Sequence, residues 1–224
     1  MMKKNKTLWI VSFLPLAISA ILFFFLPERI PMHYDVAGNI GRWGSRREIF
    51  IFPVIIPLIS LFWQCMIRSF EKTAVSAKEE KARVEAQSNI RVLRLTAILM
   101  AIGFGMMHLF FTLSGCLEAI SGAQTSMLDQ LAIINIVWSV ILILVGNFLP
   151  KAKRNSMVGL RTPKTLADDE AWRKGNRYAG KALIIAAVIT ILESLLLGGI
   201  LSTMLMVVNL IIAAIVSAVA ATKK

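Results

Sequence analysis

The sequence predicts an all-α fold, a polytopic membrane helical bundle with six transmembrane helices and both termini in the cytoplasm. Hydrophobic residues make up 57% of the 224 residues and charged residues only 17%, and the mean hydropathy is +0.70. Soluble globular proteins average about 45–50% apolar and about 25% charged residues. Six apolar stretches approach the ~20 residues that a helix needs to cross a bilayer, and Lys and Arg gather in alternate connecting segments. These observations exclude a soluble enzyme domain and a disordered chain.

The six predicted spans are Thr7–Leu26, Ile49–Ile67, Leu95–Ser114, Leu131–Leu149, Ala182–Gly199 and Ser202–Ala221. The first span follows a basic stretch, as a secretory signal does. Its apolar run exceeds the 7–15 residues of a signal core, so we expect a retained helix. The last two spans form a helical hairpin at Gly198-Gly199, because one continuous helix would be nearly twice as long as the bilayer is thick.

The positive residues orient the bundle. Three lie in the N-terminal segment, seven in residues 68–94, nine in residues 150–181 and two at the C-terminus, which puts 21 on one side. The loop of residues 27–48 carries four, and the other two connections carry none. Lys and Arg are retained in cytoplasmic loops, so the asymmetry predicts a multi-pass protein of the bacterial plasma membrane. Topology explains most of the net charge of +12, and we expect no direct nucleic-acid partner.

The chain then divides into five parts. They are the first two spans with their extracytoplasmic loop (residues 1–68), a cytoplasmic helical hairpin (69–94), spans three and four (95–149), a cytoplasmic loop with an interfacial helix (150–181), and spans five and six (182–224). The 69–94 segment is charged and lacks Gly and Pro. It is either a solvated hairpin or a surface for a partner.

The first loop is rich in turn formers, which predicts a compact extracytoplasmic structure with a turn near Gly38. Trp43 is expected at the membrane interface. His33 and Asp35 lie two residues apart, so an extended backbone points both to one side. Three interpretations stay open for this pair: half a metal site, structural hydrogen bonding, or recognition of a partner. Two ligands do not make a site, so no metal and no cofactor is predicted.

In the fourth loop, Pro163 keeps the preceding residue out of helical geometry. Thr165 is then predicted to cap a helix, with Asp168 in the capping-box position. This helix would lie at the cytoplasmic interface and lead into the fifth span, with Trp172 near the lipid headgroups. It is either an anchor or a functional surface, and its basic face suits anionic lipid equally well.

Ionisable and amide side chains inside the spans are expensive and therefore candidates for function. Four of them fall at similar depths in the outer half: His108, Asn135, Glu193 and Asn209. A Glu193–His108 pair would offset the cost of burying either side chain. The cluster is either a packing device or a cavity or proton relay. The second interpretation gives an alternative function, an intramembrane enzyme or small transporter.

Local catalytic motifs are absent from the sequence. There is no HExxH zinc motif, no phosphate-binding loop of the Walker type and no GxSxG elbow. The two cysteines, Cys65 and Cys116, lie near opposite faces and are expected to be free thiols. We therefore expect a protein that is not an enzyme.

Two stretches resemble a known family. The fourth loop carries Asn155, Gly159, Arg161, Thr162, Pro163, Thr165, Leu166, Trp172, Asn176 and Gly180. It resembles the signature of the SdpI-type bacterial membrane proteins, named for immunity to a sporulation-delaying toxin. The first loop, with Pro27, Ile30, Pro31, His33, Gly38, Trp43, Gly44 and Ser45, is similar to the amino-terminal domain of unknown function that this family carries. Lys164 departs from the aromatic residue expected there, and Asn176 from a frequent histidine.

The resemblance implies a membrane protein that protects its cell from a secreted peptide toxin or bacteriocin. It also implies a toxin receptor that holds a small winged-helix repressor at the cytoplasmic face. In this hypothesis the first loop and the outer polar cluster bind the peptide from outside, through His33, Asp35, Trp43 and Glu193. The Gly159–Trp172 segment is then the cytoplasmic output surface.

Overall fold

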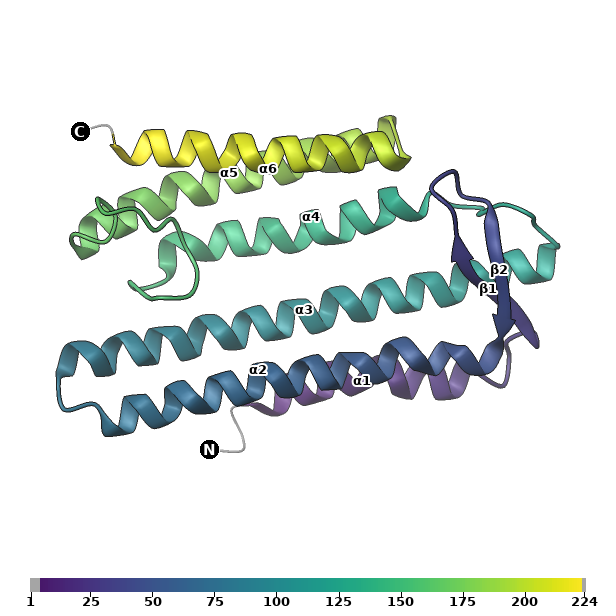
Figure 1. Cartoon of the computed structure of the whole chain (residues 1–224), viewed down its shortest axis with the longest axis horizontal. Helices are drawn as coiled ribbons and strands as arrows, with labels where there is room; N and C mark the ends of the chain where they lie inside the picture. Colours follow the sequence, from purple (N-terminus) through teal and green to yellow (C-terminus); the bar gives the residue numbers. More distant parts are fainter. Residues whose placement is uncertain (1–4, 223–224) are drawn as a thin grey trace.

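The computed structural model describes residues 5–222 and shows a bundle of helices with a small β-hairpin at one end (Figure 1). The elements are α1 (Lys6–Leu22), β1 (Arg29–Tyr34), β2 (Ile40–Ser45), the 3-10 helix η2 (Arg46–Phe50), α2 (Ile51–Ser76), α3 (Glu80–Ser121), α4 (Gln130–Phe148), the 3-10 helix η3 (Leu149–Lys151), α5 (Asp169–Leu196) and α6 (Gly199–Thr222). The helical class is confirmed, with a minor two-stranded sheet that the sequence prediction of an all-α fold did not contain.

Five helices, α2 to α6, are long and apolar enough to cross a membrane within the part of the chain that the structure describes. The sixth, α1, has 17 residues and spans about 26 Å at the usual rise. It is shorter than the predicted span because it ends at Leu22 instead of Leu26. The next residues form turns closed by a hydrogen bond from Leu26 N to Leu22 O at 3.1 Å. Pro27 then disfavours helical geometry at Leu26, so the helix does not resume before the hairpin.

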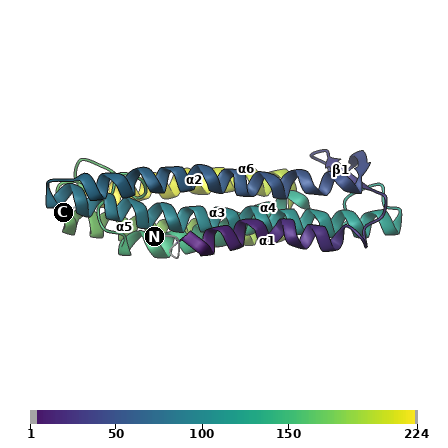
Figure 2. The ribbon, with the colours of Figure 1, turned by 90° about the horizontal axis from the view of Figure 1, so that it is seen from below.

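The helices form two groups of three that meet through α3 and α4. Helices α1 and α2 pack on α3, and helices α5 and α6 pack on α4. Figure 1 shows α3 and α4 in the middle of the bundle, and Figure 2 shows α2 and α6 on the same face of it. The first described turn of α1 and the last turn of α6 point to the same end (Figure 1).

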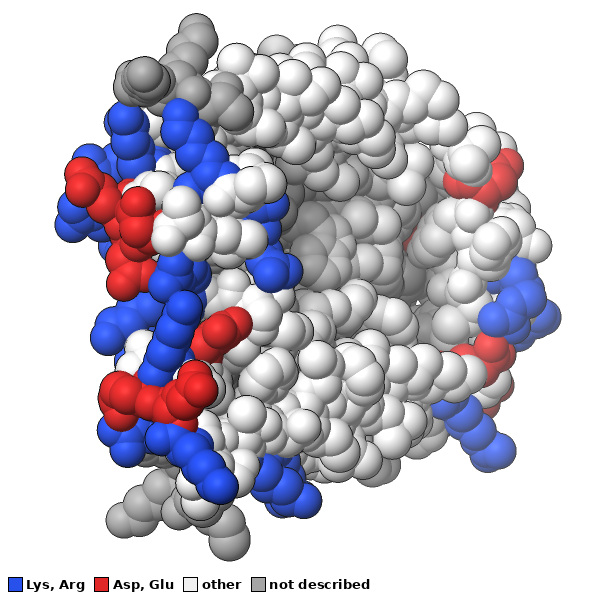
Figure 3. Space-filling view, turned by 60° about the vertical axis from the view of Figure 1, so that its left-hand side comes forward, with Lys and Arg blue, Asp and Glu red and all other residues white. Residues whose placement is uncertain are grey.

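The two ends of the bundle differ in charge. We call the end with β1 and β2 the hairpin end and the opposite end the basic end. Figure 3 shows Lys and Arg gathered at the basic end, a middle almost without charged side chains, and few cations at the hairpin end. The same figure shows a hollow along the face between the two groups of helices. This distribution agrees with the positive-inside pattern of the sequence.

At the basic end, α2 and α3 run past the apolar part of the chain. Only residues 77–79 interrupt them, so the charged 69–94 segment is helical on both sides of a short turn. At the hairpin end, α5 and α6 are joined through Leu197 and Gly198, where the sequence predicts the turn. Gly198 and Gly199 have φ values of 62° and 46°, which glycine adopts without strain.

Close helix approach holds α4 against α5. A Cβ on Gly180 would lie 2.3 Å from the carbonyl oxygen of Gly146, and one on Gly146 would lie 2.8 Å from the carbonyl oxygen of Gly180. Small residues at such crossings let helix backbones pack closely in membranes. Between α3 and α4 the contact is made instead by apolar side chains, with Leu99, Val137 and Ile141 buried together.

Candidate functional site

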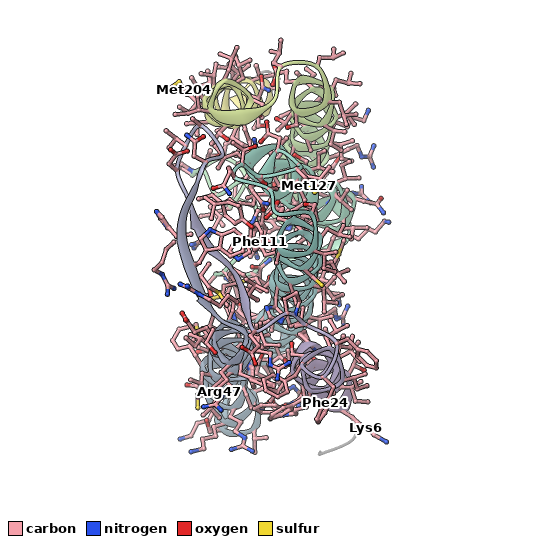
Figure 4. All side chains as sticks on the ribbon, turned by 90° about the vertical axis from the view of Figure 1, so that its right-hand side faces the viewer. Lys6, Phe24, Arg47, Phe111, Met127 and Met204 are labelled. Atoms are coloured by element: carbon pink, nitrogen blue, oxygen red, sulfur yellow. The ribbon has the colours of Figure 1, made fainter. Side chains whose placement is uncertain are left out.

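A cavity of about 420 Å³ lies at the hairpin end, between the β-hairpin and helices α2, α3 and α4. We call it the hairpin cavity. Its lining is mainly apolar and comprises Ile30, Pro31, Met32, His33, Tyr34, Asp35, Val36, Glu48, Ile49, Phe52, His108, Phe111, Thr112, Gln130, Leu131 and Ile134. Figure 4 looks onto this end, with the hairpin running from the region of Arg47 toward Met204 and Phe111 beside it. Its volume is in the range of small-molecule and peptide-side-chain pockets.

The hairpin cavity brings together residues that the sequence assigned to two separate sites. His33 and Asp35 from the first loop line it, and so does His108 from the second half of α3. The Nε2 atom of His108 lies 2.6 Å from the hydroxyl oxygen of Ser19 on α1, which fixes the imidazole against α1. Trp43 and Gly38 do not belong to the lining.

Asp35 organises the turn between β1 and β2. Its carboxylate accepts hydrogen bonds from the backbone N–H groups of Ala37 and Asn39 at 2.9 and 2.8 Å, and from the Asn39 side chain at 2.8 Å. The side-chain bond from Asn39 is the largest of several that lower the pKa of Asp35. Gly38 completes the turn with φ of 83°. This geometry matches the structural interpretation of Asp35, and the part of the chain described contains no group of three His, Cys, Asp or Glu able to hold a metal ion.

The other end of the hairpin is held by a capping box. Glu48 accepts a bond from Ser45 N at 2.9 Å, and the Ser45 hydroxyl accepts one from Arg47 N. Arg42 pairs with Glu48 at 2.8 Å. This bond, followed by that from Ser45 N, lowers the pKa of Glu48. Trp43 lies on β2, half buried, opposite Pro31 of β1.

Glu118 is the principal site residue that sequence reasoning missed. Its side chain is fully buried and accepts four hydrogen bonds: from the Tyr34 hydroxyl at 2.5 Å, the Ser114 hydroxyl at 2.9 Å, and the Ser126 hydroxyl and Met127 N at 3.0 Å. Burial, and then Glu118, raise the pKa of Tyr34. The hairpin is thus bonded to α3 and to the loop after it.

The sequence interpretation had ended the third span at Ser114 and placed Glu118 in a loop. The helix instead continues to Ser121, and Gly122 ends it in the left-handed conformation with φ of 68°. A sequence signal for this existed. Residues 115–121 contain no helix breaker after Gly115, and Gly122 is the residue expected after a helix C-terminus.

The tip of the hairpin also bonds to the α3–α4 loop. Ile40 N donates to Gln124 O at 3.1 Å, and Ser126 N donates to Gly38 O at 2.7 Å. Further along this loop, Asp129 caps α4 by accepting from Ala132 N at 2.9 Å, and it also accepts from Gly199 N in the α5–α6 turn. The α3–α4 loop therefore connects the hairpin to the second group of helices.

The predicted polar cluster inside the bundle is wrong as a single cluster. The Asn209 amide donates to Glu193 at 2.7 Å, between α6 and α5. The Asn135 amide donates to Ser202 at 3.0 Å, between α4 and α6. Glu193 and His108 do not bond to each other, because His108 faces Ser19 in the first group of helices. The sequence predicts the depth of a residue in a span but not the neighbour that its face meets. In place of the predicted Glu193–His108 pair, Glu193 bonds to Asn209 and His108 lies against Ser19.

In the structure the fourth loop comprises residues 152–168. Buried polar side chains hold it in place. Asn155 is buried, and its side-chain oxygen accepts from Met157 N at 2.9 Å and Val158 N at 2.8 Å. Asn176, also buried, accepts from Leu160 N at 2.7 Å and donates to Trp172 O at 3.0 Å. Two asparagine side chains thus satisfy backbone groups of a segment without regular structure.

Thr165 is not the helix cap that the sequence predicts. Asp168 caps α5 by accepting from Ala171 N at 2.7 Å. Thr165 is buried and donates its hydroxyl to Leu160 O at 2.7 Å while accepting from Thr162 N at 2.9 Å. The prediction failed because Asp168 is an equally good cap and the loop needs the Thr165 hydroxyl to close on itself.

Trp172 does not lie among the lipid headgroups. It is 2% exposed, and its indole N–H donates to Ala152 O at 2.8 Å. Gly159 packs on it with φ of 133°, and a Cβ there would lie 2.9 Å from the Trp172 ring and 2.5 Å from the Asn176 side-chain oxygen. The predicted interfacial helix is the first part of α5 and continuous with its apolar part.

The loop is also bonded to α3. Asn89, which sequence reasoning did not single out, donates to the Ser156 hydroxyl at 2.8 Å and accepts from Ser156 N at 2.9 Å. Ser88 donates to Lys153 O at 3.0 Å. The exposed members of the predicted signature are Arg161, Pro163 and Leu166. Arg161 donates to Ser156 O at 3.0 Å.

Family comparisons match both unusual segments. Residues 151–221 match the SdpI/YfhL protein family, and residues 10–56 match a domain of unknown function, DUF1648. The chain is 28% identical over 225 residues to the immunity protein SdpI of Bacillus subtilis (strain 168). The aligned region covers 98% of this chain and 94% of that protein.

The C-terminal part of the chain is similar to the SdpI/YfhL protein family, and its N-terminal part is similar to DUF1648.

The protein is a multi-pass bacterial membrane protein. No solved structure matches it. The SdpI/YfhL match begins at Lys151 and so includes residues 152–168, α5 and nearly all of α6. The DUF1648 match covers most of α1, the hairpin and the start of α2.

Proposed function

We propose that this protein protects the bacterial cell that carries it from a secreted peptide toxin, and that the hairpin cavity binds the peptide. The name of the Bacillus subtilis relative supports immunity. The observation that carries the site is the cavity of about 420 Å³ at the end of the bundle with few positive charges. By the positive-inside rule that end faces away from the cytoplasm, toward the arriving toxin.

The cavity favours an apolar segment of a peptide. Apolar side chains from the hairpin, α2, α3 and α4 form most of its lining, including Ile30, Phe52, Phe111 and Ile134. His33, Glu48 and Gln130 add a few polar groups, which fix orientation in such sites while apolar area supplies most of the affinity. The sequence hypothesis of a toxin site is therefore kept for His33 and Asp35. Trp43 and Glu193 do not line the cavity and are not part of the proposed toxin site.

The second part of the hypothesis, binding of a repressor, concerns the basic end. We propose that the exposed edge of the fourth loop, at Arg161, Pro163 and Leu166, contacts a soluble repressor when toxin is bound. The buried members of the signature shape this edge and are not themselves available to a partner. Co-purification of the repressor with the protein from toxin-treated membranes, lost in Arg161→Ala and Leu166→Ala variants, tests this step.

Expression in a toxin-sensitive strain tests the proposed function. The wild-type protein is expected to give survival at toxin concentrations that kill the parent strain. Val36→Trp should remove this protection, because Val36 lines the cavity, is 74% exposed and accepts a larger side chain at little folding cost. Leu144→Trp is the matched control, since Leu144 is 48% exposed and lies outside the cavity lining.

Both variants are compared at equal amounts in the membrane. Equal protection by Val36→Trp and wild type would show that the peptide binds elsewhere. No protection by a well-expressed wild-type protein against any peptide toxin tested would refute the immunity function itself.

A further inference from the structure

A second cavity, of about 400 Å³, lies at the basic end. We call it the basic cavity. Its walls come from three segments that are distant in sequence: the first turns of α3, the η3 segment with the three residues after it, and the first turns of α5. It lies on the opposite end of the bundle from the hairpin cavity and shares no residue with it.

The lining is strongly cationic. Five positive side chains, those of Lys81, Lys151, Lys153, Arg154 and Arg173, line this one cavity. Two carboxylates, Glu85 and Asp169, oppose them, and Asp169 is already paired with Arg154 at 3.5 Å. Positive charge is therefore in excess inside the cavity.

Three of the cations are available to a ligand. Arg154 is held by Asp169 and by Leu166 O, to which it donates at 2.9 Å. Lys151 donates to the Asn147 side chain at 3.1 Å. Within residues 5–222, Lys81, Lys153 and Arg173 form no ion pair with a carboxylate, although each is close enough to line the same space.

The backbone around these cations is fixed. Ala152 O accepts from the buried Trp172 indole at 2.8 Å, and Lys153 O accepts from Ser88 of α3 and from the Asn155 side chain, both at 3.0 Å. Lys153 thus projects from a segment bonded to both α3 and α5. A positive site with a rigid wall pays less ordering entropy on binding than flexible surface lysines do.

We propose that the basic cavity binds a phosphate-bearing anion, either inorganic phosphate or the phosphate of an anionic phospholipid headgroup. Ammonium and guanidinium groups form strong charge-assisted bonds with phosphate oxygens. Basic pockets on the cytoplasmic side of membrane proteins suit anionic headgroups. The volume fits a phosphate with an attached organic group, and a compact cavity suits a compact anion better than an extended acidic peptide.

Binding by the full-length protein in a neutral detergent tests the proposal. The probes are inorganic phosphate, short-chain phosphatidylglycerol and, as the neutral headgroup control, short-chain phosphatidylcholine. We expect saturable binding of at least one of the first two by calorimetry, weakened by salt, and none of the third. Loss of two charge-assisted bonds in the Lys153→Gln, Arg173→Gln double variant should weaken binding about tenfold or more.

A matched double variant controls for general charge. Lys72→Gln with Lys78→Gln removes the same charge from exposed positions of the basic end outside the cavity and should bind within about twofold of wild type, since exposed distant charges are screened. If the cavity variant does not fold, Lys81→Gln, at an exposed position of α3, replaces it.

The outcomes distinguish a soluble phosphate from a lipid headgroup, and three results would refute the proposal. Saturation by inorganic phosphate points to a soluble ligand, and saturation by phosphatidylglycerol alone points to a lipid headgroup. Equal weakening by the two double variants, binding of neither anionic probe, or binding of a glutamate decapeptide in their place would each overturn the proposal. The result does not depend on the immunity function, which is measured by survival.

Discussion

The carboxylate of Glu118 joins parts of the chain that are distant in sequence. It accepts from Tyr34 of the hairpin, Ser114 of its own helix, and Ser126 and Met127 of the following loop. A buried donor that loses its acceptor costs about 1–3 kcal/mol. Replacing Glu118 therefore leaves several donors without their acceptor at once.

Glu118→Leu should lower the stability of the folded protein by about 3 kcal/mol or more, because four donors lose one acceptor. Tyr34→Phe removes a single bond and should cost about 1 kcal/mol. Thermal unfolding in detergent measures both. Glu28→Gln, at an exposed position of the same end, is the control and should change stability by less than about 0.5 kcal/mol. A Glu118→Leu protein as stable as this control would contradict the assigned role.

Gly159 offers a second residue-scale prediction. Gly159→Ala should destabilise the protein by about 2–4 kcal/mol, because the backbone has φ of 133° and the new Cβ would overlap Asn176 and Trp172. Gly122→Ala is the matched control. Gly122 also has positive φ, but its Cβ would meet nothing within 4 Å, so it should cost only about 1–2 kcal/mol. Equal melting temperatures for the two variants would refute the packing argument.

At the scale of elements, the hairpin turn depends on an ionised Asp35. The hydrogen bonds from Asn39 and Ala37 lower its pKa, so the folded turn binds a proton less readily than the unfolded chain. The contribution of Asp35 to stability is therefore fully present above its ordinary pKa of 3.8. It is lost as the pH falls through the lowered value.

Hydrogen exchange of the turn amides, corrected for intrinsic rates, measures this dependence. At neutral pH the wild type should be better protected than Asp35→Asn. The difference should shrink below pH of about 4, because protonated Asp35 and Asn are both neutral. A difference that stays constant down to acid pH would mean that the ionised carboxylate does not hold the turn.

A comparison of the elements shows which parts of the structure can be predicted from the sequence. Length and apolar composition predict α2 to α6, and turn formers predict the turn near Gly38, because both follow from local chemistry. The function of Thr165 and Trp172 was mispredicted, because a cap and a membrane-interface tryptophan are local interpretations. Both side chains are instead buried. Thr165 bonds to Leu160 within the loop, and Trp172 of α5 bonds to Ala152. Asn89 was missed because its partner Ser156 lies 67 residues away. Glu118 was missed because the predicted span ended before it and because Tyr34 lies 84 residues away.

At the scale of the whole molecule, the charge asymmetry predicts which end faces the cytoplasm. In a variant with Cys65→Ala and Cys116→Ala, a single cysteine is introduced at Val36 or Val75, which are 74% and 86% exposed at opposite ends. Val36→Cys should react with a membrane-impermeant maleimide in intact spheroplasts. Val75→Cys should react only after permeabilisation. The opposite labelling pattern would invert the topology and move the hairpin cavity to the cytoplasm.

The bonds of the hairpin also bear on how the protein is made. Tyr34 bonds to a residue 84 positions later in the chain, and synthesis runs at about 5–20 residues per second. The hairpin therefore crosses the membrane several seconds before α3 and its loop are available to dock on. Although it is among the first parts translated, it can reach its final position only after α3 and its loop have been made. During that interval its apolar side chains, such as Ile30, must be shielded by lipid or by the insertion machinery.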